Sequence, residues 1–274
     1  MKKITRSATL CMLAFLLAST AAAETLTIPG SGNPEYVLGE LAKAFNSQQK
    51  QHQVVIPPTT GTAGALHALQ EGTASIGRVG RPLKDAERSG GLTYHALGRD
   101  PVVFVGGAGV SVRAVTRDQM IDVYTGKLTD WRELGGKPGP IRAIGRESTD
   151  ASRQSIARDI KAFADMQFYE NVKFVHLDTQ MIELLDRFPT SIGFLNRSAL
   201  SAARTKLALF ALDSVEPGAE TVASGRYPLW VEVGLIYKAG ELTEAGRAFL
   251  KFVESPAGVR MLRTHGLAPA TRTR

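Results

Sequence analysis

Cysteine is almost missing from this sequence. The single cysteine of the 274-residue chain, Cys11, lies within the first 23 residues. The remainder therefore has no thiol to form a disulfide, to bind a metal or to act as a nucleophile. The five histidines are scattered and show no metal-ligand spacing. We accordingly expect no metal site and no bound cofactor.

Long apolar runs, basic clusters and catalytic signatures are also missing. Beyond the N-terminal segment, no stretch approaches the roughly 18 apolar residues that a membrane-spanning helix needs. No run of five basic residues occurs, which argues against nucleic acid as a partner. A Gly-x-Ser-x-Gly elbow or similar nucleophile signature is not found, so we expect that the protein is not an enzyme.

The N-terminus has the pattern of a secretory signal peptide. Three basic residues (Lys2, Lys3 and Arg6) precede an apolar run at 8–17 and small residues at 19–23. This pattern predicts a signal peptide at 1–23, cleavage after Ala23 and a periplasmic mature chain. Cleavage would remove three positive charges, so the formal net charge would fall from +7 to +4. That mildly basic balance favours an anionic ligand.

Strand-like and helix-like segments alternate along the mature chain. The apolar runs predict strands at 25–29, 54–57, 75–79, 101–105, 141–144, 172–175, 191–195, 206–212 and 229–237. Helical periodicity and start signals predict helices at 34–45, 65–71, 116–124, 150–166, 179–188, 243–253 and 256–264. For the first helix, Asn33 is the expected N-cap and Pro34 the first helical residue. The alternation predicts an α/β fold with mixed sheets flanked by helices.

The chain shows no Gly/Ser linker that would separate independent domains. We therefore expect two lobes that are joined by continuous hinge strands. The first lobe is expected to be discontinuous, with residues 24–104 and 230–274. The second lobe would comprise residues 105–229.

Three loops that precede predicted helices are rich in glycine and hydroxyl residues. They lie at 30–33, 59–64 and 146–153. In open α/β sheets ligands bind beyond the carboxyl ends of strands, where such loops meet helix N-termini. Glycine permits close backbone approach, and hydroxyls can donate or accept hydrogen bonds. The candidates for ligand contact are Ser31, Gly32, Thr60, Thr62, Arg146 and Ser152.

The loop that begins at Arg146 allows two interpretations. A guanidinium beside the unpaired N–H groups of a helix start suits an anion. Alternatively the segment is an ordinary strand-to-helix turn, with Asp150 or Ser152 as the N-cap and Arg146 in an ion pair. Arg78 and Arg81, near the end of the third predicted strand, are likewise open to a role in the cleft or in ion pairs.

Several motifs resemble those of the periplasmic phosphate-binding proteins, which have the two-lobed type II periplasmic-binding fold. The resemblance covers nearly all of the mature chain. The most specific segment is 119–136, with the sequence QMIDVYTGKLTDWRELGG. Further support comes from the glycine loop before the first helix and from the segments 77–83, 141–146, 191–194 and 248–256.

The resemblance implies an oxyanion held between the lobes by backbone N–H groups, hydroxyls and one arginine. Arg146 matches that arginine, Thr62 or Thr60 matches the hydroxyl of the second loop, and Ser31 with Gly32 falls in the first. The chain departs from the family at two places. Asp150-Ala-Ser152 replaces Ser-Gly-Thr, and Ser75 stands where we align the family's proton-accepting aspartate, at the end of the third strand.

The function that this resemblance implies is binding of a small oxyanion, most of all phosphate, for ABC-type uptake. An inner-membrane ABC permease is the implied partner, and we expect a monomer. The altered positions leave an alternative open. The chain would then be a binding-fold protein with a changed anion site, acting as a periplasmic sensor or as a protein-interaction component.

Overall fold

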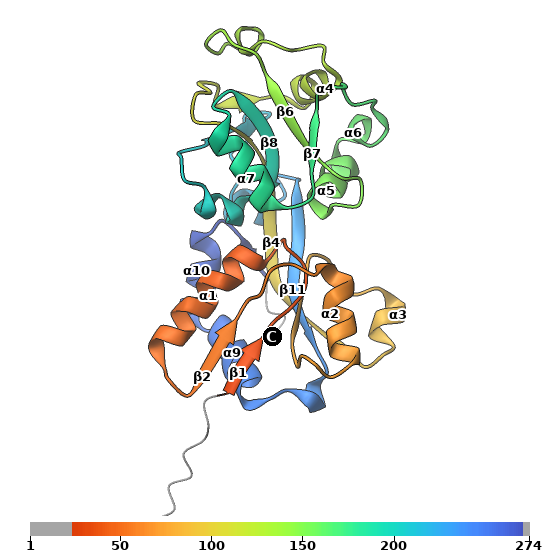
Figure 1. The fold of residues 1–274 in the computed structure, drawn as a ribbon, viewed down its shortest axis with the longest axis vertical. Helices are drawn as coiled ribbons and strands as arrows, with labels where there is room; N and C mark the ends of the chain where they lie inside the picture. Colours follow the sequence, from red (N-terminus) through yellow and green to blue (C-terminus); the bar gives the residue numbers. More distant parts are fainter. Residues whose placement is uncertain (1–23, 271–274) are drawn as a thin grey trace, which may run out of the picture.

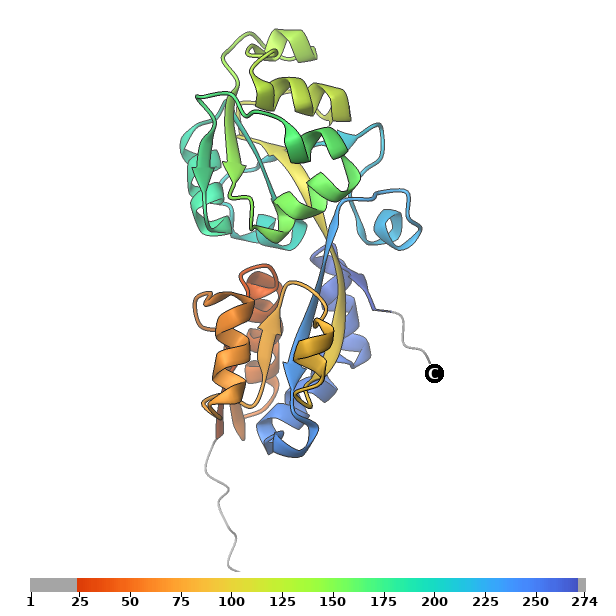
Figure 2. The same cartoon turned by 90° about the vertical axis from the view of Figure 1, so that its right-hand side faces the viewer.

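The computed structural model describes residues 24–270, so the predicted signal peptide at 1–23 lies outside the described residues. Its elements form two groups, one above the other in Figure 1. The long strands β4 (Thr93–Gly106) and β11 (Trp230–Tyr237) run from one group to the other in both views (Figures 1 and 2). The expected two-lobed α/β arrangement with connecting strands is confirmed.

The other strands are β1 (Glu24–Thr27), β2 (His52–Val55), β3 (Gly77–Val79), β5 (Ala114–Val115), β6 (Arg142–Arg146), β7 (Lys173–Val175), β8 (Ser191–Asn196), β9 (Ala208–Leu209), β10 (Ala211–Leu212) and β12 (Ala268–Pro269). The α-helices are α1 (Glu35–Gln48), α2 (Gly61–Gln70), α3 (Asp85–Arg88), α4 (Arg117–Thr125), α5 (Ala151–Asp159), α6 (Lys161–Asp165), α7 (Asp178–Arg187), α8 (Ala219–Ala223), α9 (Glu244–Val253) and α10 (Pro256–Thr264). Short 3₁₀ helices lie at η1 (Trp131–Leu134), η2 (Arg197–Ala202) and η3 (Ala239–Glu241).

One sheet continues through both lobes in the order β3-β11-β4-β8-β6-β7. In the lower lobe of Figure 1, β11 pairs antiparallel with β3 and β4, while β1 and β2 form a parallel pair. A parallel bridge between Gly30 and Arg78 joins the end of the β1 segment to β3. In the upper lobe, β4 pairs antiparallel with β8, and β6 runs parallel to both β8 and β7. The carboxyl ends of β6 and β8 therefore face the same edge of the sheet.

Aromatic side chains fill the core of the upper lobe. Phe104, Tyr124, Phe163 and Phe194 are at most 1% exposed, and their rings contact one another at centroid distances of 5.3 to 6.5 Å. Such edge-to-face pairs add about 0.5–1.5 kcal/mol each to the hydrophobic stabilisation. This packing holds the end of β4 against α4, α6 and β8.

The starts of α9 and α10 follow their predicted caps. The hydroxyls of Thr243 and Ser255 accept backbone N–H groups at the starts of α9 and α10, as the start signals predict. Some details of the prediction are wrong. Pro34, rather than Asn33, occupies the N-cap position of α1. The single helix expected at 150–166 is two helices, because the backbone leaves helical geometry at Ile160.

Within residues 24–270, none of the helices has the length and apolar character required to cross a membrane.

Candidate functional site

Arg146 is the last residue of β6 and is only 5% exposed. Its Nη1 donates to Asp178 at 2.7 Å, and its Nη2 donates to Asp150 at 2.6 Å and to the carbonyl of His176 at 3.0 Å. The ion pairs are buried, with each carboxylate side chain 11% exposed or less. Arg146 Nε has no hydrogen-bond partner in the described chain. The Nε–H group of the guanidinium therefore stays available while two carboxylates compensate the charge.

Asp150 has two roles, one for each oxygen of its carboxylate. One carboxylate oxygen accepts the backbone N–H groups of Ser152 and Arg153 and so caps α5. The other oxygen bonds to Arg146. The predicted turn with Asp150 as N-cap is thus confirmed, and the ion pair of Arg146 is buried within it rather than solvated.

Asp178 begins α7 and was not identified as a candidate from the sequence. It lies 32 positions from Arg146, and nothing in its local pattern marks it as a partner. Burial raises its pKa to about 6, against the lowering effect of Arg146, and nearby Asp150 raises it further. At neutral pH two carboxylates therefore face one guanidinium, which lowers the electrostatic attraction of this corner for an added anion.

A hydrogen-bonded chain of side chains links the two lobes. Ser31 Oγ donates to Asn33 Oδ1 at 3.1 Å, and Asn33 Nδ2 donates to Asn196 Oδ1 at 2.7 Å. Ser152 Oγ, from α5, donates to the same Asn196 oxygen at 2.9 Å. These four residues are at most 9% exposed. The structure thus brings the predicted candidates Ser31 and Ser152 together through two asparagines: Asn33, which was expected only as a helix N-cap, and Asn196, which sequence reasoning did not single out.

Arg78 fixes the loops of the lower lobe. Its side chain is completely buried and donates to the backbone carbonyls of Ile28, Ser31 and Pro57 and to the Glu35 carboxylate. Burial lowers the pKa of this guanidinium, and the neighbouring Glu35 carboxylate raises it. Because these bonds reach both the 30–33 loop and the segment before α2, Arg78 acts as a brace between them. Arg81 instead pairs with Glu87.

Gly32, Thr60 and Thr62 lie at the helix starts of the lower lobe. Gly32 is half-buried beside Thr59, whose hydroxyl donates to the carbonyl of Gly30 at 3.0 Å. The second loop is shorter than expected, because α2 begins at Gly61 and places Thr62 in its first turn. Thr62 is half-buried and Thr60 is exposed. Their role as ligand contacts stays a prediction.

The expected position of Ser75 at the ligand-facing end of the third strand is wrong. Ser75 precedes β3. The segment that leads into the 30–33 loop meets this strand at Arg78, whose backbone N–H donates to the carbonyl of Pro29 at 2.8 Å. The carboxyl end of β3 leads to Gly80. A Cβ atom at Gly80 would collide with Asn33 Oδ1 and would lie 2.8 Å from Ser31 Oγ. Ser75 was misplaced because the strand was predicted to begin there and its two ends were not distinguished.

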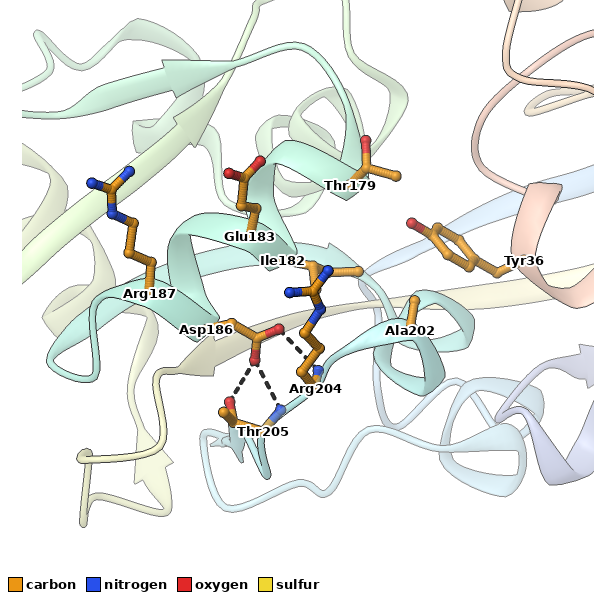
Figure 3. A pocket seen from close by; sticks show the side chains of 9 residues that line it. All are labelled: Tyr36, Thr179, Ile182, Glu183, Asp186, Arg187, Ala202, Arg204 and Thr205. Carbon is orange, nitrogen blue, oxygen red and sulfur yellow. Dashed lines mark hydrogen bonds between the residues drawn. The ribbon is translucent and has the colours of Figure 1, made fainter.

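A separate open pocket of about 650 Å³ lies between α1 and the outer side of α7 (Figure 3). Tyr36 lines it from the lower lobe, and Thr179, Glu183 and Arg204 are among its residues in the upper lobe. Asp186 also lines the pocket and accepts hydrogen bonds from the backbone N–H groups of Arg204 and Thr205 (Figure 3). The pocket includes none of the predicted ligand contacts, so it is distinct from the corner at Arg146.

A family model described as the PBP superfamily domain matches residues 18–257 of the chain. The chain belongs to the PBP superfamily. The phosphate-binding protein PstS of Bacillus subtilis (strain 168) is 27% identical over 239 residues, which cover 85% of this chain and 76% of the relative. The PstS protein of Borreliella burgdorferi is 21% identical over 247 residues, which cover 88% of each.

Solved structures of other proteins have the same two-lobed fold as this chain. One, from Clostridium perfringens, is described as a phosphate ABC transporter substrate-binding protein with bound phosphate. It matches 90% of this chain and all of its own with a TM-score of 0.75 and 25% identity. An ABC-type phosphate transport receptor from Vibrio cholerae matches 90% of this chain and all of its own with a TM-score of 0.62 and 20% identity. The resemblance to phosphate-binding proteins seen in the motifs is therefore confirmed.

Proposed function

We propose that this protein is an extracytoplasmic receptor that binds phosphate between its two lobes and presents it to an ABC uptake system. The observation that carries the proposal is the buried donor corner at Arg146 and Ser152, which the Asn196–Asn33 contact joins to Ser31 of the other lobe. The relatives named as phosphate-binding proteins, and the phosphate-containing structure of the same fold, support phosphate as the ligand.

The proposed mechanism is binding coupled to lobe closure, without a catalytic step. Donors from both lobes would surround the oxyanion in a site that excludes water, where charge-assisted hydrogen bonds are strong. Closure would then be favoured by the ligand because the closed state has contacts to it that the open state lacks. We place the hinge where β4 and β11 pass between the lobes, with residues 24–104 and 230–274 on one side and 105–229 on the other.

The finer features of this function are proposals of the same kind. The receptor would be a periplasmic monomer after signal-peptide cleavage at Ala23, and an inner-membrane ABC permease would recognise its closed form. N-terminal sequencing of protein from the periplasmic fraction should begin at Glu24. Native mass spectrometry should show a single chain.

Isothermal titration of the mature chain with phosphate tests the proposed function. The protein should first be stripped of ligand by unfolding and refolding, and then titrated with phosphate, sulfate, arsenate and molybdate. We expect a dissociation constant for phosphate of about 1 μM or tighter, on the order of −8 kcal/mol. Arg146→Ala should weaken binding by about 100-fold, since it removes a charged donor.

Arg142→Ala is the matched control, because Arg142 lies on the same strand but is exposed. Its affinity should equal that of the wild type. Equal phosphate affinity in the Arg146→Ala variant would contradict the proposed site. Absence of heat with all four anions would contradict the proposed function.

The alternative function, a periplasmic sensor or protein-interaction component, is favoured by one observation. Asp150 and Asp178 already compensate the charge of Arg146, which weakens this corner as an anion site. A melting temperature that does not respond to phosphate, together with recovery of a protein partner from periplasmic extract, would support this alternative.

A further inference from the structure

Two buried donors at the edge of the upper lobe have no acceptor. Among residues 24–270, four buried side-chain atoms lack a hydrogen-bond partner: His52 Nδ1, Arg146 Nε, Asn196 Nδ2 and Arg197 Nε. Arg146 and Asn196 are the last residues of β6 and β8, which are neighbouring parallel strands. Arg197 lies against Gly266, at the end of α10, and does not belong to this pair. A native buried donor without an acceptor calls for an explanation, and a ligand is one.

The orientation of the Asn196 amide follows from its two hydrogen bonds. Asn33 Nδ2 and Ser152 Oγ both donate to Asn196 Oδ1, at 2.7 and 2.9 Å. An amide oxygen has two acceptor sites, so both are used. The Nδ2 group must then face elsewhere, and the side chain is 0% exposed, so water does not reach it from bulk solvent.

Asn196 is also connected to the guanidinium of Arg146 through two intermediate residues. Ser152, which bonds to Asn196 by its hydroxyl, donates its backbone N–H to Asp150 at 3.0 Å, and Asp150 in turn bonds to Arg146. The two unpaired donors thus belong to one hydrogen-bonded cluster beyond the carboxyl ends of two strands. This is where open α/β sheets bind their ligands.

We propose that Asn196 is a ligand-binding residue, whose Nδ2 group donates a hydrogen bond to the bound oxyanion. This inference rests on the proposed function and deepens it. Because two carboxylates compensate the charge of Arg146, uncharged donors are expected to supply a larger share of the affinity than the arginine alone would suggest. Asn196 also bonds to Asn33 of the other lobe, so the same side chain would couple ligand binding to closure.

Phosphate titration of Asn196→Asp tests this role. The substitution keeps an Oδ1 acceptor for Asn33 and Ser152 and replaces only the Nδ2 donor by an anionic oxygen. We expect the phosphate affinity to fall by about 100-fold or more, since a donor is lost and a repulsive charge is gained. Asn171→Asp is the matched control, because it makes the same change at an exposed position of the same lobe. Its affinity should stay within about twofold of the wild type.

Asn196→Ser provides a second variant if the buried aspartate prevents folding. This substitution removes the Nδ2 donor without adding a charge, and the expected loss is about 10-fold. An independent readout uses the wild-type protein alone. The side-chain amide resonances of Asn196, assigned by NMR, should shift when phosphate is added.

The outcomes separate the two proposals. If the wild type binds phosphate but both variants bind equally well and the Asn196 resonances do not move, the role of Asn196 is refuted while the function stands. If the wild type binds no phosphate, the proposed function itself fails. Weakened binding in the variants together with a phosphate-dependent shift of the Asn196 amide would establish the contact.

Discussion

Two buried arginines, one in each lobe, show how the same residue type acquires different roles. Arg78 lies on β3 and donates to three backbone carbonyls and one carboxylate. Arg146 ends β6 and bonds to two carboxylates and one carbonyl, which leaves its Nε unpaired. A guanidinium whose donors all bond to the protein braces the loops around it. One with an unused donor beside other unpaired groups is available for a ligand.

The largest difference between the two arginines should appear in stability. Arg78→Met would leave Glu35 and three buried carbonyls without their donor, and should lower the free energy of unfolding by about 3–5 kcal/mol. Urea denaturation followed by circular dichroism would measure this loss. Arg81→Met is the control, since the Arg81–Glu87 pair is partly exposed and should contribute less than about 1 kcal/mol.

The stability loss of Arg146→Met, measured in the same assay, should be compared with that of Arg78→Met. It should be the smaller of the two, because Asp178 can take up a proton when the guanidinium is removed. Equal losses for Arg78→Met and Arg146→Met would mean that both arginines are structural braces.

The pH dependence of stability should reveal the acidic partners of Arg146. Burial raises the pKa of Asp178 from 3.8 to about 6, so between these values the folded state binds more protons than the unfolded state. The free energy of unfolding should therefore fall as the pH rises through this window, by about 2–3 kcal/mol from this group. Urea denaturation at half-unit steps from pH 4 to pH 8 would measure the slope.

Asp178→Asn should remove this contribution and make the profile less steep between about pH 4 and 6. A decline that continues toward pH 7 should remain, because burial raises the pKa of Asp100, on the connecting strand β4, to about 7 despite the hydrogen bonds from Ser198. A profile unchanged by Asp178→Asn would show that Asp178 is not the titrating group.

The smallest effect is expected for a variant that makes the surroundings of Arg146 more like an ordinary anion site. Asp150→Asn removes one compensating charge from Arg146 and keeps a side-chain oxygen that caps α5, since Asn and Asp cap helices about equally well. We expect the affinity for phosphate to rise by about tenfold, while stability falls because the amide nitrogen cannot accept the hydrogen bond that Arg146 Nη2 donates to Asp150. Titration calorimetry of both proteins would measure the ratio. An affinity that falls instead would mean that Asp150 positions Arg146 for the ligand.

Local sequence patterns predicted most of the fold and part of the candidate site. The alternation of apolar runs with helix start signals placed most strands and helices, and the caps at Thr243 and Ser255 were recognised because capping depends on residues three positions apart. Ser31 and Arg146 were identified because each lies where a strand leads into a helix, and Ser152 because it lies in the first turn of the helix that follows Arg146. That rule uses the order of elements along the chain and needs no knowledge of distant contacts.

The partners of these residues were decided by tertiary structure alone. Asn33 and Asn196 are 163 positions apart, and Arg146 and Asp178 are 32 positions apart, so no local spacing relates them. Ser75 was placed at the wrong end of its strand, because its position was taken from the alignment with the family's aspartate although it precedes β3 along the chain. The sequence by itself determined where the chain alternates between strand and helix and where its loops suit an anion. Only the folded sheet determined which buried donors are satisfied by the protein and which are left for a ligand, since that depends on the side chains that parallel strands bring to a common edge.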